Sequence, residues 1–166
     1  MILKNLNKSF LINSFLVIFI FLLDRISKIY VIYLDKKFLG SEIFSSKYLN
    51  ITLIWNEGIA FGLLSFQHEN LYNFLTFIIF MVVLVILFLF KNATGIKKYA
   101  LLMIFGGAIG NLYDRIIYYA VPDFIDFHVG NFHWFIFNVS DIFITLGVIL
   151  MIFIELTSKS IKNDNV

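Results

Sequence analysis

The chain has 166 residues, of which 60% are hydrophobic, 19% aromatic and only 14% charged, and its mean hydropathy is +0.89. This composition excludes an ordinary soluble domain and indicates a protein of the lipid bilayer. The absence of cysteine excludes disulfides, thiolate metal sites and cysteine nucleophiles, and the net charge of +2 gives no sign of nucleic-acid binding.

Four apolar segments are long enough to cross the ~30 Å hydrocarbon core, which takes about 20 helical residues. We expect transmembrane helices at about 10–34, 71–90, 99–120 and 134–156. Lysines lie before the first segment, between the second and third, and after the fourth: Lys4, Lys8, Lys91, Lys97, Lys98, Lys159 and Lys162. Since basic loops face the cytoplasm, both termini should be cytoplasmic. The prediction is one membrane domain over 1–166, an all-α bundle of four transmembrane helices.

The first segment is predicted to be a retained helix rather than a cleaved signal peptide, because no small-residue cleavage site follows it. The extracytoplasmic segment, about 35–70, should contain a small β-subdomain. Apolar residues alternate with mostly polar ones over 49–56, a period of two that predicts a strand. The piece from Gly58 to Phe66 is apolar and could lie along the membrane surface.

Three predicted helices carry acidic residues at one level of the membrane. Counted from the cytoplasmic ends at ~1.5 Å per residue, Asp24, Asp114 and Asp141 lie about 21 to 27 Å up, near the outer edge of the core. A carboxylate there usually faces a partner, a water-filled cavity or a substrate. The alternative is that these acids are interfacial anchors paired with neighbouring basic residues.

Asp141 has no cation within a helical turn, so another segment must compensate it. Asp123 is the natural candidate, because Pro122 ends the third helix and the chain then returns toward the fourth. Two close carboxylates share a proton and titrate as a pair. One can then accept a proton from water while the other donates one, as in aspartic proteases.

The sequence contains no motif for zinc-protease catalysis, for a serine nucleophile or for a phosphate-binding loop. Tyr72 stands where a zinc-protease motif beginning at His68 needs its second histidine, and no Gly-x-Ser-x-Gly sequence occurs. The three histidines fall in outer loops without ligand spacing, which favours packing over metal binding, and no metal is expected: His68, His128 and His133. Gly106 and Gly110 lie within an apolar helix and have the spacing of close helix packing rather than a phosphate loop.

Five motifs follow one another over about residues 20–145: Asp24-Arg-Ile-Ser-Lys28, Asn56-Glu-Gly-Ile-Ala-Phe-Gly62, Gly107-Ala-Ile-Gly-Asn-Leu-Tyr-Asp-Arg115, Val121-Pro-Asp-Phe-Ile125 and Phe137-Asn-Val-Ser-Asp141. In this order they resemble the motifs of lipoprotein signal peptidase, also called signal peptidase II. Each motif alone is only moderately specific, whereas five in sequence are a strong resemblance.

The resemblance implies a multi-pass aspartyl endopeptidase of the bacterial inner membrane, with its active site at the extracytoplasmic face and no cofactor. Its substrates would be prolipoproteins whose cysteine carries a diacylglyceryl group, cut on the amino side of that cysteine. We expect it to act as a monomer among membrane lipids. By position, Asp123 and Asp141 match the catalytic pair.

Other matched positions are expected to support the pair or the substrate. Asn111, Arg115 and Asn138 would surround the pair, Asn56 and Gly58 would belong to the loop that covers the substrate, and Asp24 and Lys28 would form a positioning pair. Asp114 and Asp126 are expected to be bystanders, Asp126 being a second acid close to Asp123. Ser140 departs from the alanine that the family usually has.

Two rival functions remain open on the residues alone. A small transporter or ion-binding four-helix bundle could use the same acids as a proton relay, although transport sites favour the bilayer midplane and broken helices. A purely structural four-helix scaffold is the other alternative.

Overall fold

The computed structural model describes residues 2–58 and 69–163. Four helices and four strands follow in this order: α1 (Ile2–Lys37), β1 (Phe44–Ser45), β2 (Leu49–Asn56), α2 (Glu69–Lys91), α3 (Gly95–Tyr118), β3 (Val121–Val129), β4 (Phe132–Phe137) and α4 (Val139–Asn163). The strands form one antiparallel sheet in sequence order, β1-β2-β3-β4.

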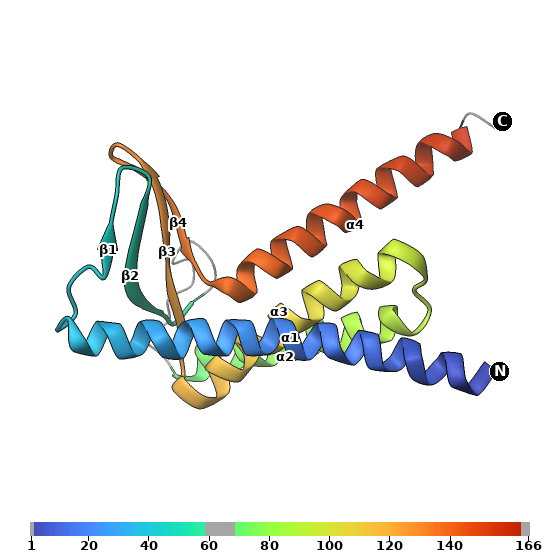
Figure 1. The fold of residues 1–166 in the computed structure, drawn as a ribbon, viewed down its shortest axis with the longest axis horizontal. Coiled ribbons are helices and arrows are strands. Elements are labelled where there is room, and N and C mark those ends of the chain that lie inside the picture. The colour runs from blue at the N-terminus through green and yellow to red at the C-terminus, as the bar shows by residue number, and fades with distance from the viewer. Residues whose placement is uncertain (1, 59–68, 164–166) are drawn as a thin grey trace.

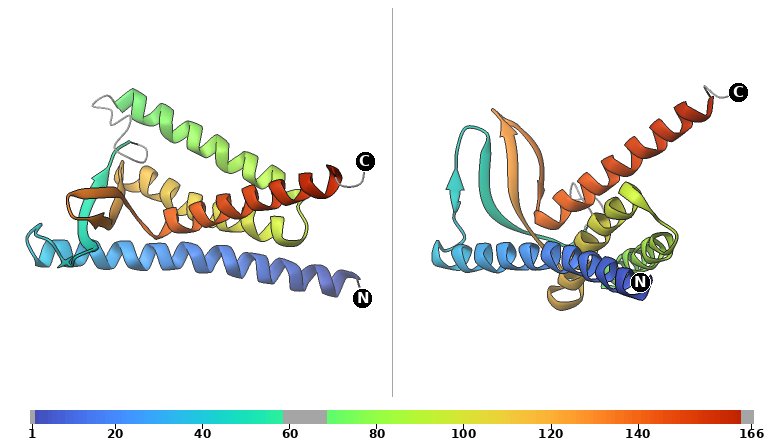
Figure 2. Two further views of the ribbon diagram at one scale, coloured as in Figure 1. Left: turned by 90° about the horizontal axis from the view of Figure 1, so that it is seen from above. Right: turned by 45° about the vertical axis from the view of Figure 1, so that its right-hand side comes forward.

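The sheet stands at one end of the helices, and α1 and α4 both run to the other end, where they diverge from one another (Figures 1 and 2). A short turn joins α2 to α3 at that same far end. The lysines of the α2–α3 turn therefore lie at the same end of the molecule as the far ends of α1 and α4.

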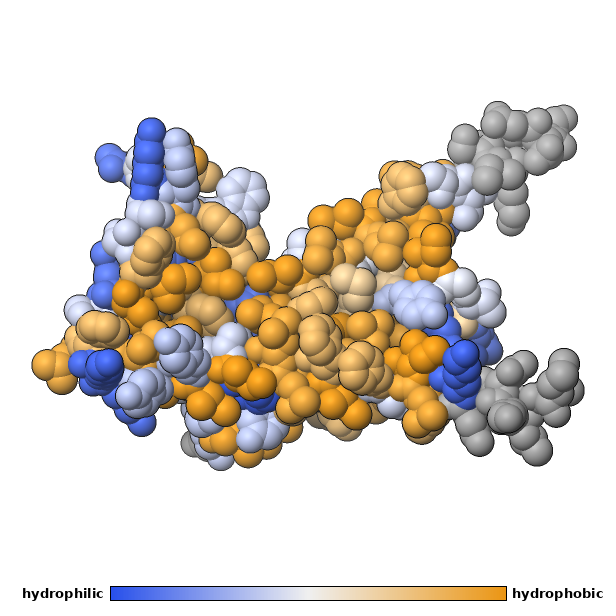
Figure 3. Space-filling model, in the orientation of Figure 1, coloured by the Kyte–Doolittle hydropathy of each residue, from blue (hydrophilic) through white to orange (hydrophobic). Residues whose placement is uncertain are grey.

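Three helical stretches are long and apolar enough to cross a membrane within the part of the chain that the structure describes: Tyr72–Lys91, Gly95–Tyr118 and Val139–Ser158. α1 is not among them. The outward surface of the helices is hydrophobic (Figure 3), with Phe15, Phe88 and Phe153 each more than 60% exposed. An apolar surface of this extent would be unfavourable in water and suits contact with lipid.

Small residues let α3 approach its neighbours closely. A Cβ added at Gly107 would lie 2.5 Å from the backbone oxygen of Ser140 on α4, and one at Gly110 would lie 2.8 Å from Asp24 Oδ2 on α1. A Cβ at Gly106 would lie 3.1 Å from Ile20. The predicted packing role of Gly106 and Gly110 is confirmed, and it brings the polar ends of three helices together.

The prediction for the fourth helix is wrong at its start. We expected a helix from residue 134, but residues 132–137 form β4, which pairs with β3, and α4 begins at Val139. Apolar residues dominate both elements and only the short, mostly polar stretch 138–141 lies between them, so a window average of hydropathy does not separate them. Asn138 caps the helix and sets its beginning.

The third helix ends two residues earlier than predicted, because Tyr119 adopts a left-handed conformation with φ 56°. The strand predicted at 49–56 is confirmed as β2. It belongs to a four-stranded sheet that includes 121–129, a segment expected to be a loop. Beyond Gly58, the surface-lying piece predicted up to Phe66 falls outside the described residues.

Candidate active site

Asp141 lies in the first turn of α4 and forms a reciprocal cap with Asn138. The side-chain Oδ1 of Asn138 accepts the backbone N–H of Asp141 at 3.2 Å, and Asp141 Oδ2 accepts the backbone N–H of Asn138 at 3.2 Å. In such a capping box, the N-cap residue and the third helical residue satisfy each other's free amide groups. The positive end of the helix dipole favours a negative charge at this position. Local sequence thus fixes this carboxylate at a helix N-terminus.

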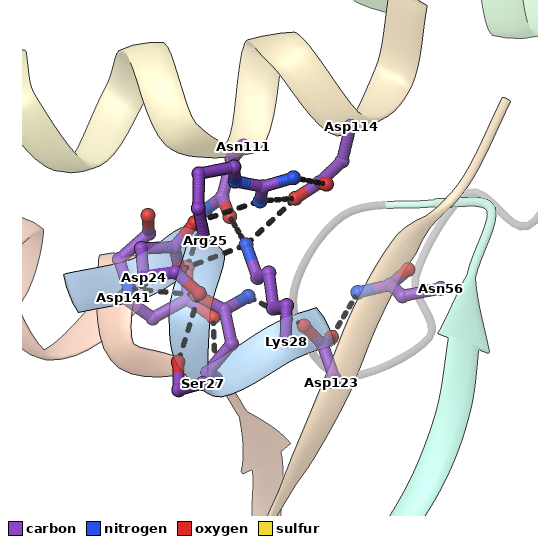
Figure 4. Close-up of polar contacts among 11 residues, drawn as sticks. Asp24, Arg25, Ser27, Lys28, Asn56, Asn111, Asp114, Asp123 and Asp141 are labelled. Atoms are coloured by element: carbon purple, nitrogen blue, oxygen red, sulfur yellow. Dashed lines mark hydrogen bonds and ion pairs between the residues drawn. The ribbon is translucent and has the colours of Figure 1, made fainter. Parts of the chain in front are cut away.

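Asp123 lies on β3, beside the end of β2 (Figure 4). Asn56 Nδ2 donates to its Oδ2 at 2.8 Å, and Asn138 Nδ2 donates to its Oδ1 at 2.6 Å. Burial, followed by the charge of Asp141, raises the pKa of Asp123 from 3.8 to about 6, although the two amide hydrogen bonds act in the lowering direction. The charge of Asp141 therefore acts on Asp123, as expected of two neighbouring carboxylates.

Behind the pair, α1 and α3 meet in a buried ion cluster of Asp24, Arg25, Lys28 and Asp114 (Figure 4). Lys28 Nζ lies 2.9 Å from Asp24 Oδ1 and 2.7 Å from Asp114 Oδ2. Arg25 Nη2 donates to Asp24 at 2.8 Å and to Asp114 at 2.6 Å, and its Nη1 also donates to Asp114. Two acids and two bases balance, which is the condition under which buried charges are tolerated.

One amide connects the ion cluster to Asp141. Lys28 Nζ donates to Asn111 Oδ1 at 3.0 Å, and Asn111 Nδ2 donates to Asp141 Oδ1 at 2.7 Å. Because Lys28 needs an acceptor, the amide oxygen of Asn111 faces Lys28 and its N–H₂ faces the carboxylate. The backbone N–H of Ser140 also donates to Asp24 Oδ1 at 3.0 Å. The cluster thus orients both the side chain of Asp141 and the helix turn that carries it.

Arg115 extends the site toward the segment that follows β2. Its Nη2 donates to the carbonyl oxygen of Gly58, whose own N–H donates to Asn56 Oδ1 at 2.9 Å. The side chain of Asn56 therefore makes two hydrogen bonds: its nitrogen donates to Asp123, and its oxygen accepts from the backbone N–H of Gly58. Arg115 Nε and Nη1 are buried and have no hydrogen-bond partner among the described residues. These donors are available to a bound molecule.

A cavity of about 250 Å³ opens among α2, α3, α4 and the sheet and gives access to the pair. Its polar lining comes from five side chains, Asn56, Asn111, Arg115, Asp123 and Asp141, and the rest is apolar. A second, more open hollow of about 500 Å³ is lined mainly by aromatic and aliphatic side chains of the β3–β4 hairpin and α4, and it also reaches Asp141. Apolar surface with a few convergent polar groups is the usual form of a ligand site.

The arrangement suits acid–base chemistry on a water molecule. Asp123 and Asp141 line one cavity, interact electrically and are held by amide donors. A carboxylate pair of this kind can take one proton from water and give another to a substrate.

The structure brings together all nine residues that the sequence indicated. These are Asp123 and Asp141 with Asn111, Arg115, Asn138, Asn56, Gly58, Asp24 and Lys28. Sequence reasoning missed the role of the Asn138 cap, although Asn-x-x-Asp before an apolar run is a recognisable capping signal.

The two acids expected to be bystanders of the pair occupy different places in the structure. Asp114 is fully buried and is shared by Arg25 and Lys28, so it is part of the ion cluster. Asp126 does not contact the amides that hold Asp123; its Oδ2 lies 2.8 Å from His133 Nδ1. The placement of Asp126, His128 and His133 within reach of one another was not foreseen, because strand pairing rather than spacing along the chain produces it.

The sequence and the fold are both similar to those of known proteins. Residues 16–157 match the family model described as signal peptidase (SPase) II. The chain is similar to the lipoprotein signal peptidase of Pelagibacter ubique, with 45% identity covering 95% of each chain, and to that of Anaplasma phagocytophilum, with 37% identity covering 85% of this chain and 89% of that protein. A solved structure of a bacterial membrane enzyme, determined by the in meso method at 2.3 Å resolution, matches with a TM-score of 0.71 and 29% identity over 90% of each chain.

Proposed function

Because this chain belongs to the signal peptidase II family, we propose that it is a lipoprotein signal peptidase in which Asp123 and Asp141 activate the water that cleaves a prolipoprotein. It is an aspartic-type endopeptidase of a bacterial membrane. The observation that carries the residue assignment is the shared cavity, into which both carboxylates project with an amide donor on each.

In the proposed reaction the pair begins with one proton. The ionised carboxylate removes a proton from water as the water oxygen attacks the scissile carbonyl carbon, and the protonated carboxyl donates its proton to the carbonyl oxygen. The tetrahedral intermediate, which carries two hydroxyl groups, then collapses: the C–N bond breaks, the departing nitrogen takes the proton that the pair removed from water, and one hydroxyl returns its proton to the other carboxylate. The pair again holds one proton. The products are a signal peptide with a new carboxyl terminus and a lipoprotein with a free amino group on its modified cysteine.

The surrounding residues support this chemistry by position. Asn56, Asn138 and Asn111 fix the two carboxylates, so little reorganisation is needed when water attacks. Arg115 holds the chain at Gly58 with one nitrogen, and its Nε and Nη1, which have no hydrogen-bond partner within residues 2–58 and 69–163, can donate to the polar backbone of a peptide. A peptide that enters from the bilayer needs such donors, since lipid supplies none.

The substrate class fits the surfaces beside the pair. A prolipoprotein with a diacylglyceryl cysteine brings both an extended peptide and two acyl chains to the scissile bond. Asp141 lines the enclosed cavity as well as the larger aromatic hollow. We propose that peptide and lipid occupy these two apolar surfaces and meet at the aspartates.

The proposed topology has both termini and the α2–α3 turn in the cytoplasm, with the sheet and the aspartate pair at the extracytoplasmic face. Lys91, Lys97 and Lys98 around that turn support this orientation. Under this proposal α1 is the fourth membrane-crossing helix, its charged residues being paired within the bundle.

Cleavage by the purified protein tests the proposal. A prolipoprotein modified with diacylglycerol should be cut before its cysteine, whereas the same precursor without the lipid should be cut poorly. The Asp141→Asn variant at equal concentration is the matched control and should be inactive. Equal cleavage of both precursors would refute the substrate assignment, and full activity of the variant would refute the role of Asp141.

A further inference from the structure

The β3–β4 hairpin carries a second cluster of side chains, separate from the groups that hold the aspartate pair. Asp126 and His128 lie on β3 and His133 lies on β4. One potential ligand atom from each of the three residues lies within 4.8 Å of the other two. The hydrolytic chemistry uses none of them.

Strand geometry explains why these residues meet. Successive side chains alternate between the faces of a strand, so Asp126 and His128 share a face of β3. Antiparallel pairing sets His133 directly opposite His128, and their rings stack with centroids 5.0 Å apart. The turn between the strands uses Gly130 at φ 59°. The hairpin therefore gathers an O,N,N donor set from residues only seven positions apart in sequence.

Two atoms of the cluster lack a partner. Asp126 is 6% exposed, and although its Oδ2 lies 2.8 Å from His133 Nδ1, its buried Oδ1 has no hydrogen-bond partner among the described residues. The same holds for buried Nδ1 of His128. A buried carboxylate oxygen and a buried imidazole nitrogen without partners are costly. The histidine–aspartate pair alone does not satisfy them, whereas a cation between the three side chains would.

The donor set selects the kind of cation. Two imidazole nitrogens and one carboxylate oxygen match the three protein ligands of an open Zn²⁺ site, in which water takes the fourth position. Calcium and magnesium prefer sites built of oxygen alone. A tetrahedral zinc ion with ligands at about 2.0–2.1 Å sets the ligand atoms about 3.4 Å apart. The side chain of His133 is 53% exposed, so little packing opposes the small rotation that closure needs.

We propose that Asp126, His128 and His133 bind one divalent transition-metal ion, with Zn²⁺ as the preferred metal, at the tip of the β3–β4 hairpin. The ion would join the two strands beyond their main-chain hydrogen bonds. His128 also lines the aromatic hollow that reaches Asp141. The site therefore stabilises one wall of the surface that leads to the active site, without taking part in hydrolysis.

Cobalt titration of the purified, tag-free protein in detergent tests the proposal, because Co²⁺ at such a site gives visible ligand-field absorption that zinc removes. We expect one equivalent of Co²⁺ to bind and one equivalent of Zn²⁺ to displace it. His128→Gln and His133→Gln should each weaken Zn²⁺ binding by at least about 10- to 100-fold. His68→Gln, which alters the remaining histidine of the sequence, should bind as the parent protein does.

A second readout separates loss of the site from loss of folding. Zn²⁺ should raise the unfolding temperature of the parent protein and of His68→Gln, and it should leave His133→Gln unchanged. Absence of stoichiometric Co²⁺ absorption in the parent would overturn the proposal. Parent-like metal binding by a folded His133→Gln variant would overturn it as well. Neither result bears on the proposed peptidase activity, since the measurement involves no substrate.

Discussion

Replacement of Asp123 by Asn should abolish cleavage and also make the protein more stable at neutral pH. The carboxyl of Asp123 is 3% exposed, and burial together with the charge of Asp141 raises its pKa from 3.8 to about 6. The folded protein therefore binds a proton here more tightly than the unfolded chain does. Stability from this group is fully present below pH 3.8 and is lost as the pH rises through about 6. Asparagine carries no charge at any of these pH values, so the Asp123→Asn variant does not lose this stability as the pH rises.

The loss of stability at neutral pH follows from the difference between the pKa of Asp123 in the unfolded chain, 3.8, and in the folded protein, about 6. A difference of about 2.2 pH units at about 1.36 kcal/mol each amounts to about 3 kcal/mol. At acidic pH the variant should be slightly less stable, because an asparagine cannot accept from both Asn56 and Asn138, and one lost hydrogen bond costs about 1 kcal/mol. At pH 7 the gain of about 3 kcal/mol exceeds this loss of about 1 kcal/mol, so the free energy of unfolding of Asp123→Asn should be about 2 kcal/mol higher than that of the parent protein.

Thermal unfolding of both proteins in one detergent at pH 4 and pH 7 measures this difference. We expect the unfolding temperature of Asp123→Asn, relative to the parent protein, to rise by several degrees between the two pH values, at about 2–4 °C per kcal/mol. Glu42→Gln removes an exposed carboxylate and is the matched control. A stability difference for Asp123→Asn that stays constant with pH would refute the reasoning.

Two further predictions concern buried polar groups. Asp114→Asn leaves Arg25 and Lys28 buried against Asp24 alone, so the free energy of unfolding should fall by about 3–5 kcal/mol; a decrease under about 1 kcal/mol in thermal or denaturant unfolding would show that the ion cluster is not structural. Ser140→Ala removes a fully buried hydroxyl that has no partner among the described residues, so it should stabilise the protein by about 1 kcal/mol and retain cleavage; destabilisation would indicate that the hydroxyl makes an essential contact.

The helices and the residues of the candidate site could be predicted because their signals are local or follow from the resemblance. Length and hydropathy marked the four helices, and alternation marked β2. The β3–β4 hairpin could not be predicted in the same way, since apolar residues at 134–137 and from 142 onward flank a mostly polar break of only four residues, 138–141. What separates them is strand pairing with β3 and the Asn138 cap. Long-range pairing overrides hydropathy at such a boundary.

The polar network shows the same limit of local information. The pairing of Asp24 with Lys28 is a local contact four residues apart along a helix and was expected. Asp114 looked dispensable because its strongest partners, Arg25 and Lys28, lie more than 80 residues earlier in the chain. The position of Asn111 between Lys28 and Asp141 depends on three helices meeting at one level. Such contacts become visible only once the close packing at the glycines of α3 is known.

The central claim, that Asp123 and Asp141 act as one water-activating unit, is tested most directly by a double-variant cycle. Single-turnover cleavage of a diacylglyceryl-modified precursor would be measured for Asp123→Asn, Asp141→Asn and the double variant. Each single variant should lose at least about 100-fold in rate, and the double variant should be no slower than the slower single variant, because either change disables the unit. Multiplicative losses, or near-normal cleavage by either single variant, would contradict the account.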